Sequence, residues 1–180
     1  MSFRRQIGIG LLLLFSFHPA VADTVTEAEV KLALVYNMTR FISWPEAGNG
    51  DSFDLCVAGE DAYDIAQENL RGRKIGERDI RVNLLEENTE APEFCDLVYV
   101  TQHEARRTAA LLRRYEGQPV LMVSDAPDFI EDGGMIALSF DRGRVGMTIS
   151  VAAYESAGLT ISSQLLELAR VVDTDRTAGG

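Results

Sequence analysis

Three short and almost wholly apolar runs of residues are the strongest constraint on how this chain can fold. They read FDLCVAG at 53–59, CDLVYVT at 95–101 and PVLMVS at 119–124. Runs of this length, bounded by turn residues, are typical of buried strands. Segments with helical spacing of apolar residues separate them, for example 61–70 with Ala62, Ile65, Ala66 and Leu70 on one side. Strands that alternate with helices predict an α/β sheet.

A strand pair in the second half of the chain makes the predicted sheet mixed. Residues 135–140 and 145–151 flank the turn sequence DRGR, which predicts a β-hairpin. Another strand is expected at 80–85, after the basic loop RGRKIGERD. Because a hairpin is antiparallel, the sheet is not wholly parallel. With no internal repeat and no linker, we predict a single-domain mixed β-sheet flanked by helices, with a C-terminal β-hairpin and helix.

Three helices are expected in the second half of the chain. Thr101 and Glu104 have the spacing of a capping box, which predicts a helix start there. A short helix at 152–157 should end at Gly158, and an amphipathic helix is predicted over 162–172. The inner face of the first of these helices is predicted to comprise Ala105, Ala109, Leu112 and Tyr115.

The helix nearest the start of the fold leads to the chain's only tryptophan. Thr26 and Glu29 form another capping box, and Pro45 disfavours helical geometry at Trp44, so the helix is predicted to end there. Helical spacing gives this helix a predicted core-facing stripe, interpreted as packing rather than as a ligand site. The stripe comprises Val30, Leu34, Asn37, Phe41 and Trp44.

Two consequences follow for polar residues on this helix. Asn37, if it lies on the buried stripe, needs a hydrogen-bond partner in the core. Tyr36 and Arg40 stand four residues apart on a neighbouring face, where they are free to meet a partner.

The first 22 residues have the pattern of a secretory signal peptide. Arg4 and Arg5 precede a short apolar run at 7–17, and the small residues Ala20 and Ala22 form a cleavage site. We therefore expect cleavage after Ala22, export to the periplasm, and a single domain at 23–180 with its core at about 29–172.

Charge limits the kinds of partner. The full chain has a net charge of −11, and loss of the two arginines makes the mature chain more acidic, which disfavours nucleic acid and anionic membranes. The basic loop stands out against this background. It is either a site for an anion or acidic partner, or a set of solvated charges, on Arg71, Arg73, Lys74 and Arg78.

The two cysteines, Cys56 and Cys95, are an even count in a compartment that oxidises thiols. A disulfide between them is expected, and two buried free thiols are the alternative.

The reactive side chains form no recognisable catalytic set. His103 is the one histidine left after cleavage, which excludes a multi-histidine zinc site, and a solvated histidine is a simpler interpretation than a catalytic one. The acidic turn at 125–132 lacks the register of a calcium loop and runs into Gly133 and Gly134, which suit unusual backbone angles. No catalytic, cofactor or metal site is predicted, and a binding or regulatory protein is the leading class.

Several longer segments, in order and at similar spacing, resemble the YfiR family of small periplasmic regulators. They are LALVYNMTRFISWP, CDLVYVT, PVLMVSDAPDFIEDGGMIAL and AAYESAGLTISSQLLELA. The similarity extends from about 29 to 172. Its signature positions in this chain are Asn37, Phe41, Trp44, Pro45, Gly133 and Gly134.

The resemblance implies a function. Such proteins bind the periplasmic sensor domain of the inner-membrane diguanylate cyclase YfiN and repress it, which lowers cyclic di-GMP and biofilm formation. A YfiB-like outer-membrane lipoprotein can capture the repressor, and the family is associated with homodimers. By this resemblance the chain is a non-enzymatic regulator without a cofactor, and we expect its contact surface around Tyr36, Arg40 and Arg78.

Two other functions remain open from the sequence. One is a small-ligand sensor or solute-binding protein that holds a metabolite at the carboxyl edge of the sheet. The other is an exported hydrolase that uses His103 and Asp125.

Overall fold

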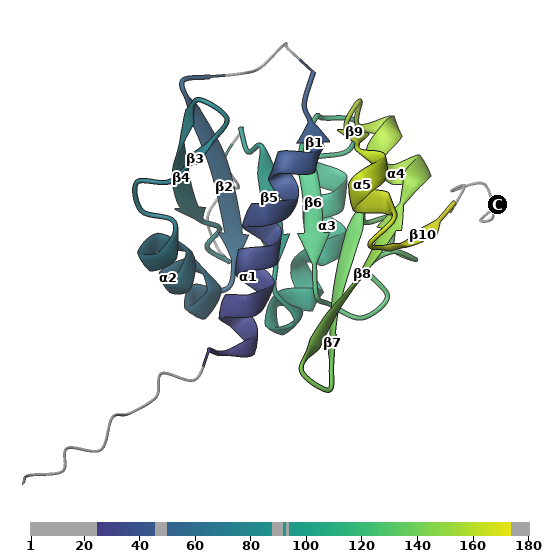
Figure 1. The fold of residues 1–180 in the computed structure, drawn as a ribbon, viewed down its shortest axis with the longest axis horizontal. Helices are drawn as coiled ribbons and strands as arrows, with labels where there is room; N and C mark the ends of the chain where they lie inside the picture. The colour runs from purple at the N-terminus through teal and green to yellow at the C-terminus, as the bar shows by residue number, and fades with distance from the viewer. Residues whose placement is uncertain (1–24, 46–49, 88–91, 93, 174–180) are drawn as a thin grey trace, which may run out of the picture.

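A computed structural model describes residues 25–45, 50–87, 92 and 94–173 (Figure 1). The predicted signal peptide, residues 1–22, lies outside the described residues. The described chain folds around one eight-stranded sheet with the strand order β10-β8-β7-β6-β5-β2-β4-β3. The prediction of a single-domain mixed α/β fold is confirmed.

The centre of the sheet is parallel and its two sides are antiparallel. The five neighbouring strands from β4 to β7 are parallel to one another, whereas β3 pairs antiparallel with β4, and β8 pairs antiparallel with β7 as the predicted hairpin. The bounds are β2 Ser52–Ala58, β3 Lys74–Ile75, β4 Arg78–Leu84, β5 Leu97–Val100, β6 Leu121–Ser124, β7 Ile136–Asp141 and β8 Arg144–Ser150.

The three apolar runs are the middle of the core, as predicted. Every residue of β5 and β6 is buried, and so are the last four residues of β2. Cys56 in β2 forms a disulfide with Cys95, whose Cα lies 6.0 Å away, just before β5. The predicted disulfide is therefore confirmed, and the alternative of two free thiols is wrong.

Helices cover both faces of the sheet. In Figure 1, α1 crosses the face toward the viewer and α3 lies behind the strands. The helices are α1 Glu27–Met38, α2 Glu60–Asn69, α3 Thr108–Arg114, α4 Val151–Ser156 and α5 Ser163–Leu166, with 3-10 segments η1 Thr39–Phe41 and η2 Gln102–Arg107. None of the described helices is long and apolar enough to span a bilayer.

Helix α1 starts where the sequence predicts and ends earlier. The Thr26 hydroxyl accepts from the backbone N–H of Glu29, and the Glu29 carboxylate accepts from that of Thr26, so the capping box is confirmed. The helix ends at Met38 rather than Trp44, because Ile42 is extended and pairs antiparallel with Ile161. This pairing joins β1 Ile42–Ser43 to β9 Thr160–Ile161 and stops the helix before Pro45 can act.

The predicted core-facing stripe of α1 is only partly right. Leu34, Phe41 and Trp44 pack against the core and are partly buried, whereas Val30 and Asn37 are exposed. The fully buried apolar residues of the helix are instead Leu32, Val35 and Met38. The helix has apolar residues on several sides, so spacing alone does not single out the face that the sheet covers. The amide of Asn37 donates to the carbonyl oxygen of Ala33 in the same helix at 2.8 Å, so it needs no partner in the core.

The predicted capping box at Thr101 does not form. The Thr101 side chain accepts no backbone N–H, the N–H of Glu104 donates instead to the carbonyl oxygen of Thr101 at 2.9 Å, and the Glu104 carboxylate pairs with Arg107 at 3.5 Å. The chain then makes the 3-10 segment η2 before α3 begins.

The late start of α3 changes which residues it buries. Thr108, Leu111 and Tyr115 face the core, whereas Ala109 is exposed. Of the predicted inner residues, only Tyr115 is fully buried.

The short helix α4 and the glycine after it match their prediction, since Gly158 has φ +72°. The final amphipathic helix does not, because α5 makes only one turn. Residues Arg170–Val172 then form β10, parallel to β8. Valines suit a strand, and this pairing satisfies backbone groups on the edge of β8 that an isolated helix would leave open.

Candidate interaction surface

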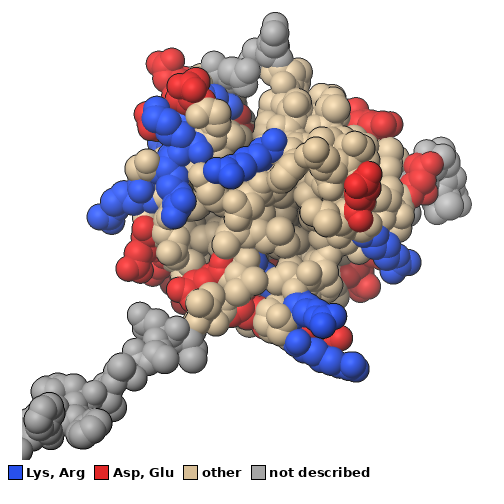
Figure 2. Space-filling view, viewed as in Figure 1, with Lys and Arg blue, Asp and Glu red and all other residues tan. Residues whose placement is uncertain are grey.

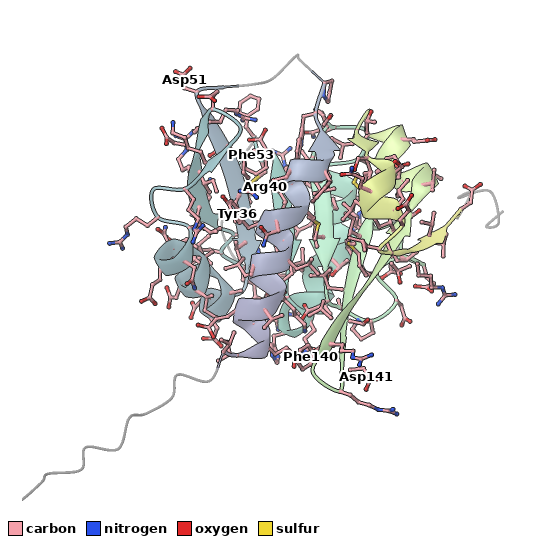
Figure 3. The ribbon with its side chains drawn as sticks, in the orientation of Figure 1. Tyr36, Arg40, Asp51, Phe53, Phe140 and Asp141 are labelled. Carbon is pink, nitrogen blue, oxygen red and sulfur yellow. A yellow bond between two sulfur atoms is a disulfide. The ribbon has the colours of Figure 1, made fainter. Side chains whose placement is uncertain are left out.

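The three predicted contact residues, Tyr36, Arg40 and Arg78, all lie at one groove of about 430 Å³. It lies between the end of α1 and the β3–β4 hairpin, and Figure 3 shows Tyr36 and Arg40 on the helix with Phe53 behind them. We call this the Tyr36 groove. Its other lining residues include Thr39, Ile42, Trp44, Lys74 and Ile75.

Tyr36 lies between two guanidinium groups. The guanidinium carbon of Arg40 is 6.0 Å from the ring centroid and that of Arg73 is 5.6 Å away. The tyrosine hydroxyl donates to the carbonyl oxygen of Lys74 at 3.2 Å, which ties α1 to β3. Cations this close to an aromatic ring are attracted by its quadrupole, so the ring helps to hold both arginines in place.

The two arginines keep a net positive charge at the groove. Within the described part of the chain, no carboxylate forms an ion pair with Arg40 or Arg73. Lys74 pairs with Asp79 at 3.2 Å on the exposed surface, where the pair is screened by water. Guanidinium groups without a carboxylate partner bind carboxylates in forked geometry, so the groove is suited to an acidic ligand.

The space-filling view agrees with this local charge. In Figure 2 the Lys and Arg side chains gather over the end of α1 and the β3–β4 hairpin, whereas the neighbouring face around α5 is largely uncharged. This concentration stands out because the whole chain has a net charge of −11. Of the basic loop, Arg73 and Lys74 are exposed as solvated charges would be, whereas Arg78 is largely buried, so the alternative of solvated charges is wrong for Arg78.

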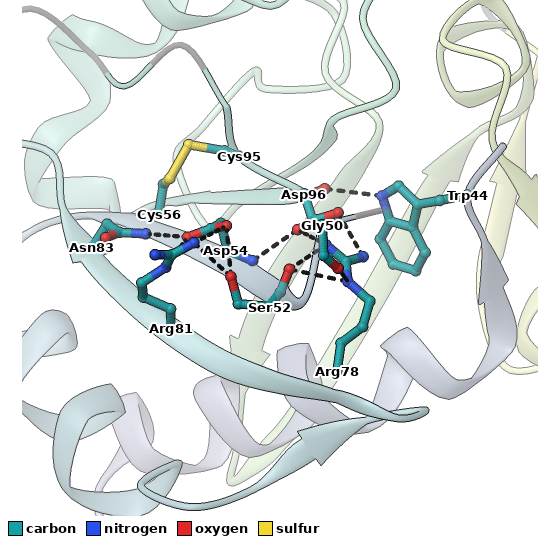
Figure 4. Close-up of polar contacts among 10 residues, drawn as sticks. All are labelled: Trp44, Gly50, Ser52, Asp54, Cys56, Arg78, Arg81, Asn83, Cys95 and Asp96. Atoms are coloured by element: carbon teal, nitrogen blue, oxygen red, sulfur yellow. Dashed lines mark hydrogen bonds and ion pairs between the residues drawn. A yellow bond between two sulfur atoms is a disulfide. The ribbon is translucent and has the colours of Figure 1, made fainter. Parts of the chain in front are cut away.

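Arg78 has a different place from the other two predicted contact residues. Its guanidinium makes two hydrogen bonds to the Asp96 carboxylate, at 2.9 and 2.7 Å (Figure 4). It also lies 5.3 Å from the centroid of the Phe53 ring. It also donates to the carbonyl oxygens of Gly50 and Ser52. The side chain is only 19% exposed, so Arg78 braces the groove, whereas Arg40 is exposed and Tyr36 is half-buried.

Trp44 is part of the same brace. Its indole N–H donates to the carbonyl oxygen of Asp96 at 3.0 Å, and its ring meets Phe53 edge to face at a centroid distance of 5.2 Å. The Asp96 carboxylate also accepts the backbone N–H of Asp54 at 2.7 Å. These contacts connect the chain after α1 to the starts of β2 and β5. Trp44 therefore stabilises the groove mainly through its packing on Phe53 and its hydrogen bond to Asp96.

Steric constraints explain why glycine occupies positions 133 and 134 of the predicted signature. Gly133 has φ +97°, a conformation that other residues rarely adopt. A Cβ on Gly134 would stand 2.3 Å from the Phe129 ring, so only glycine fits there.

The residues expected of a hydrolase do not form a catalytic set. Both oxygens of the Asp125 carboxylate have partners, the backbone N–H of Gln102 and the ammonium of Lys31, so Asp125 does not orient His103. His103 is exposed, and in the described residues no three His, Cys, Asp or Glu side chains converge as metal ligands.

Sequence reasoning missed two partners in this region. Asp96 follows Cys95 in an apolar run, and nothing in the spacing connects it with Arg78. Arg73 lies in a basic loop whose direction relative to α1 is set by the hairpin. The only signal in the sequence is the two-residue spacing of Arg78 and Ile80 along β4, which places both side chains on one face of the sheet.

Sequence comparison decides the family. The protein family described as YfiR/HmsC-like matches residues 28–170, nearly the whole described fold. The chain belongs to the YfiR/HmsC-like family. This family consists of periplasmic, non-catalytic regulators associated with diguanylate cyclase signalling, so the resemblance seen in the sequence is confirmed. A comparison with curated proteins finds no match.

Proposed function

We propose that this YfiR/HmsC-like protein represses an inner-membrane diguanylate cyclase by binding its periplasmic, YfiN-like sensor domain. Binding lowers cyclic di-GMP and biofilm formation and involves no catalysis by the repressor. The family match over residues 28–170 is the observation that carries this function. The buried disulfide supports it, since the bond suits an oxidising compartment.

The Tyr36 groove is the proposed contact surface. Its exposed Arg40 and the neighbouring Arg73 flank an aromatic ring, and arginine and tyrosine are the residue types that most often dominate the energy of protein interfaces. The partner segment that fits it is acidic, with carboxylates that pair with the two guanidinium groups. The Arg78–Asp96 brace keeps this surface rigid, which reduces the entropy lost on binding.

A gene deletion tests the function. Deletion is expected to raise cyclic di-GMP and surface attachment, and expression of the wild-type chain in trans should restore both. An unchanged cyclic di-GMP level in a strain that normally produces the protein contradicts repression of a cyclase.

A binding experiment tests the surface. The Arg40→Glu variant should bind the purified sensor domain about tenfold or more weakly in biolayer interferometry, because it places a carboxylate against an acidic segment. Arg113→Glu is the matched control, since Arg113 is exposed on α3, on the opposite face of the sheet. Wild-type affinity should also fall as salt is raised. Equal loss in both variants would rule out the Tyr36 groove as the site.

Three further family properties complete the proposal. A YfiB-like outer-membrane lipoprotein sequesters the protein, the protein is a homodimer, and its signal peptide is cleaved after Ala22. Co-purification, light scattering and the intact mass of the periplasmic protein test these in turn. A mature N-terminus other than Asp23 would contradict the cleavage site.

A further inference from the structure

A second cavity lies at the opposite edge of the sheet from the Tyr36 groove. It has a volume of about 720 Å³ and opens beside the carboxyl ends of β2, β4 and β5. The chain passes from β2 through α2 to β4 and then returns to the other side of β2 as β5, so the strand order reverses here. In open α/β sheets this switch point is where ligands bind. We call this cavity the switch-point crevice.

We propose that the switch-point crevice binds a small organic cation that carries two or more ammonium groups, that is, a diamine or polyamine. This goes beyond the proposed repressor function, since it concerns a different edge of the molecule and a different class of ligand.

A glycine shapes the mouth of the crevice. Gly59 has φ +131°, and a Cβ at this position would lie 2.7 Å from the hydroxyl oxygen of Thr101. The chain after β2 therefore turns directly into α2, and the ends of β2 and β5 come close together. The cavity volume falls in the range typical of sites for small molecules.

A largely buried tyrosine that faces the crevice provides the specific observation. Tyr99 in β5 lines the crevice and is only 2% exposed, and within the described part of the chain no protein group forms a hydrogen bond with its hydroxyl. The hydroxyl is not one of the fully buried unpaired polar atoms of the described residues, so it opens into the crevice, where a ligand can reach it. A ligand amine in the crevice would supply the hydrogen-bond partner that the protein does not.

The charge of the lining favours a cation. Seven carboxylate residues line the crevice against two permanent cations, Lys31 and Arg107. The Lys31 ammonium is already held by Asp125 at 2.6 Å and by Glu27, and Arg107 is bonded to the carbonyl oxygens of Leu85 and Glu86 and to Glu104. Both cations are therefore already paired and are not available to an anionic ligand. Glu60 and Asp61 add negative charge at the start of α2.

The same field acts on the tyrosine. Burial, and then the charges of Asp125 and Glu27, raise the pKa of Tyr99 well above its ordinary value, so the hydroxyl stays protonated. Burial opposes a charge of either sign, but the negative charges of Asp125 and Glu27 favour a positive ligand beside the hydroxyl. An organic cation fits better than a metal ion, because the described carboxylates do not converge as metal ligands.

Titration calorimetry with the mature full-length protein tests the proposal. Putrescine and spermidine should each give a saturable isotherm that weakens with added salt, whereas succinate and calcium chloride should give none. Tyr99→Phe removes only the hydroxyl and should weaken amine binding by about tenfold. Tyr154→Phe is the matched control, since Tyr154 is a buried tyrosine in α4 that does not line the crevice, and its variant should bind as the wild type does.

A second variant keeps the test independent of folding. Asp61 is exposed in the first turn of α2, so Asp61→Asn should fold normally and still bind spermidine more weakly. The proposal is overturned if neither amine binds at millimolar concentration, if Tyr99→Phe and Tyr154→Phe weaken binding equally, or if succinate or calcium binds more tightly than spermidine.

Discussion

Single residues at the amino ends of β2, β4 and β5 hold the Tyr36 groove in shape. Asp96 alone accepts from the guanidinium of Arg78, the backbone N–H of Asp54 and, through its carbonyl, the indole of Trp44. Its side chain is 13% exposed, so its charge depends on these donors in place of water. A carboxylate in such a place stabilises the fold only while its partners remain.

Removal of Arg78 should therefore be costly. Arg78→Met is expected to lower the free energy of unfolding by about 3 kcal/mol, since it leaves the Asp96 carboxylate partly buried without its cation. Urea denaturation followed by circular dichroism measures this change. Arg81→Met is the matched control, because Arg81 pairs with Asp54 from a largely exposed position and should have a much smaller effect. Similar losses for both variants would contradict the structural role of Arg78.

Gly134 is a second residue with a sharp steric requirement. Gly134→Ala is expected to destabilise the protein by about 2 kcal/mol, because the added methyl group overlaps the buried Phe129 ring. Thermal or urea unfolding measures the loss. Gly50→Ala serves as the control, since a Cβ there meets no atom within 4 Å, and it should leave stability nearly unchanged.

At the scale of elements, α1 connects the two candidate sites. Glu27 and Lys31 near its start line the switch-point crevice, and Tyr36 near its end lines the Tyr36 groove. Its twelve residues span about 18 Å, so one rigid helix passes between the two edges of the sheet. The position of both sites therefore depends on which face of α1 packs on the sheet.

Paired substitutions test the face of α1. Leu32→Ala should cost about 3 kcal/mol of stability, because it opens a cavity beneath the helix, whereas Asn37→Ala should have little effect. Chemical denaturation of the two variants under identical conditions gives the comparison. The reverse order of stability would mean that Asn37 rather than Leu32 faces the core.

On the scale of the whole molecule, the disulfide is the one covalent link beyond the chain itself in the described structure. It closes a loop over a sequence separation of 39 residues that includes the end of β2, α2 and the β3–β4 hairpin, and both cysteines are buried in the core. The hairpin in this loop carries Lys74, Ile75 and Arg78 of the Tyr36 groove. The bond therefore restricts the unfolded state of the segment that includes this hairpin.

Loss of the disulfide should lower global stability. The double variant Cys56→Ala and Cys95→Ala is expected to lose about 4 kcal/mol, which is the loop-closure entropy returned to the unfolded chain. Equilibrium unfolding under oxidising and reducing conditions provides the measurement. Reductant should destabilise the wild type and leave the double variant unchanged; an unchanged wild type would contradict a stabilising disulfide.

Much of the fold follows from local sequence. Strands β2, β5 and β6, the β7–β8 hairpin and the capping box of α1 match their predictions, because each depends on residues within one element or one turn of each other. The same reasoning fails at Thr101, where the Glu104 carboxylate pairs with Arg107 and the Asp125 carboxylate, from a distant turn, accepts the backbone N–H of Gln102. It also fails at residues 170–172, where the open edge of β8 draws the chain into a strand.

The sequence by itself determined the alternating α/β order, the pairing of the two cysteines and the likeness to the YfiR/HmsC-like family, since local periodicity, residue count and ordered motifs carry this information. The tertiary structure alone decided the buried face of α1, the inward place of Arg78 and the position of Tyr99 in the switch-point crevice. Those outcomes depend on which surfaces and charges meet across the sheet, and residues distant in the chain meet only after the strands have taken their order.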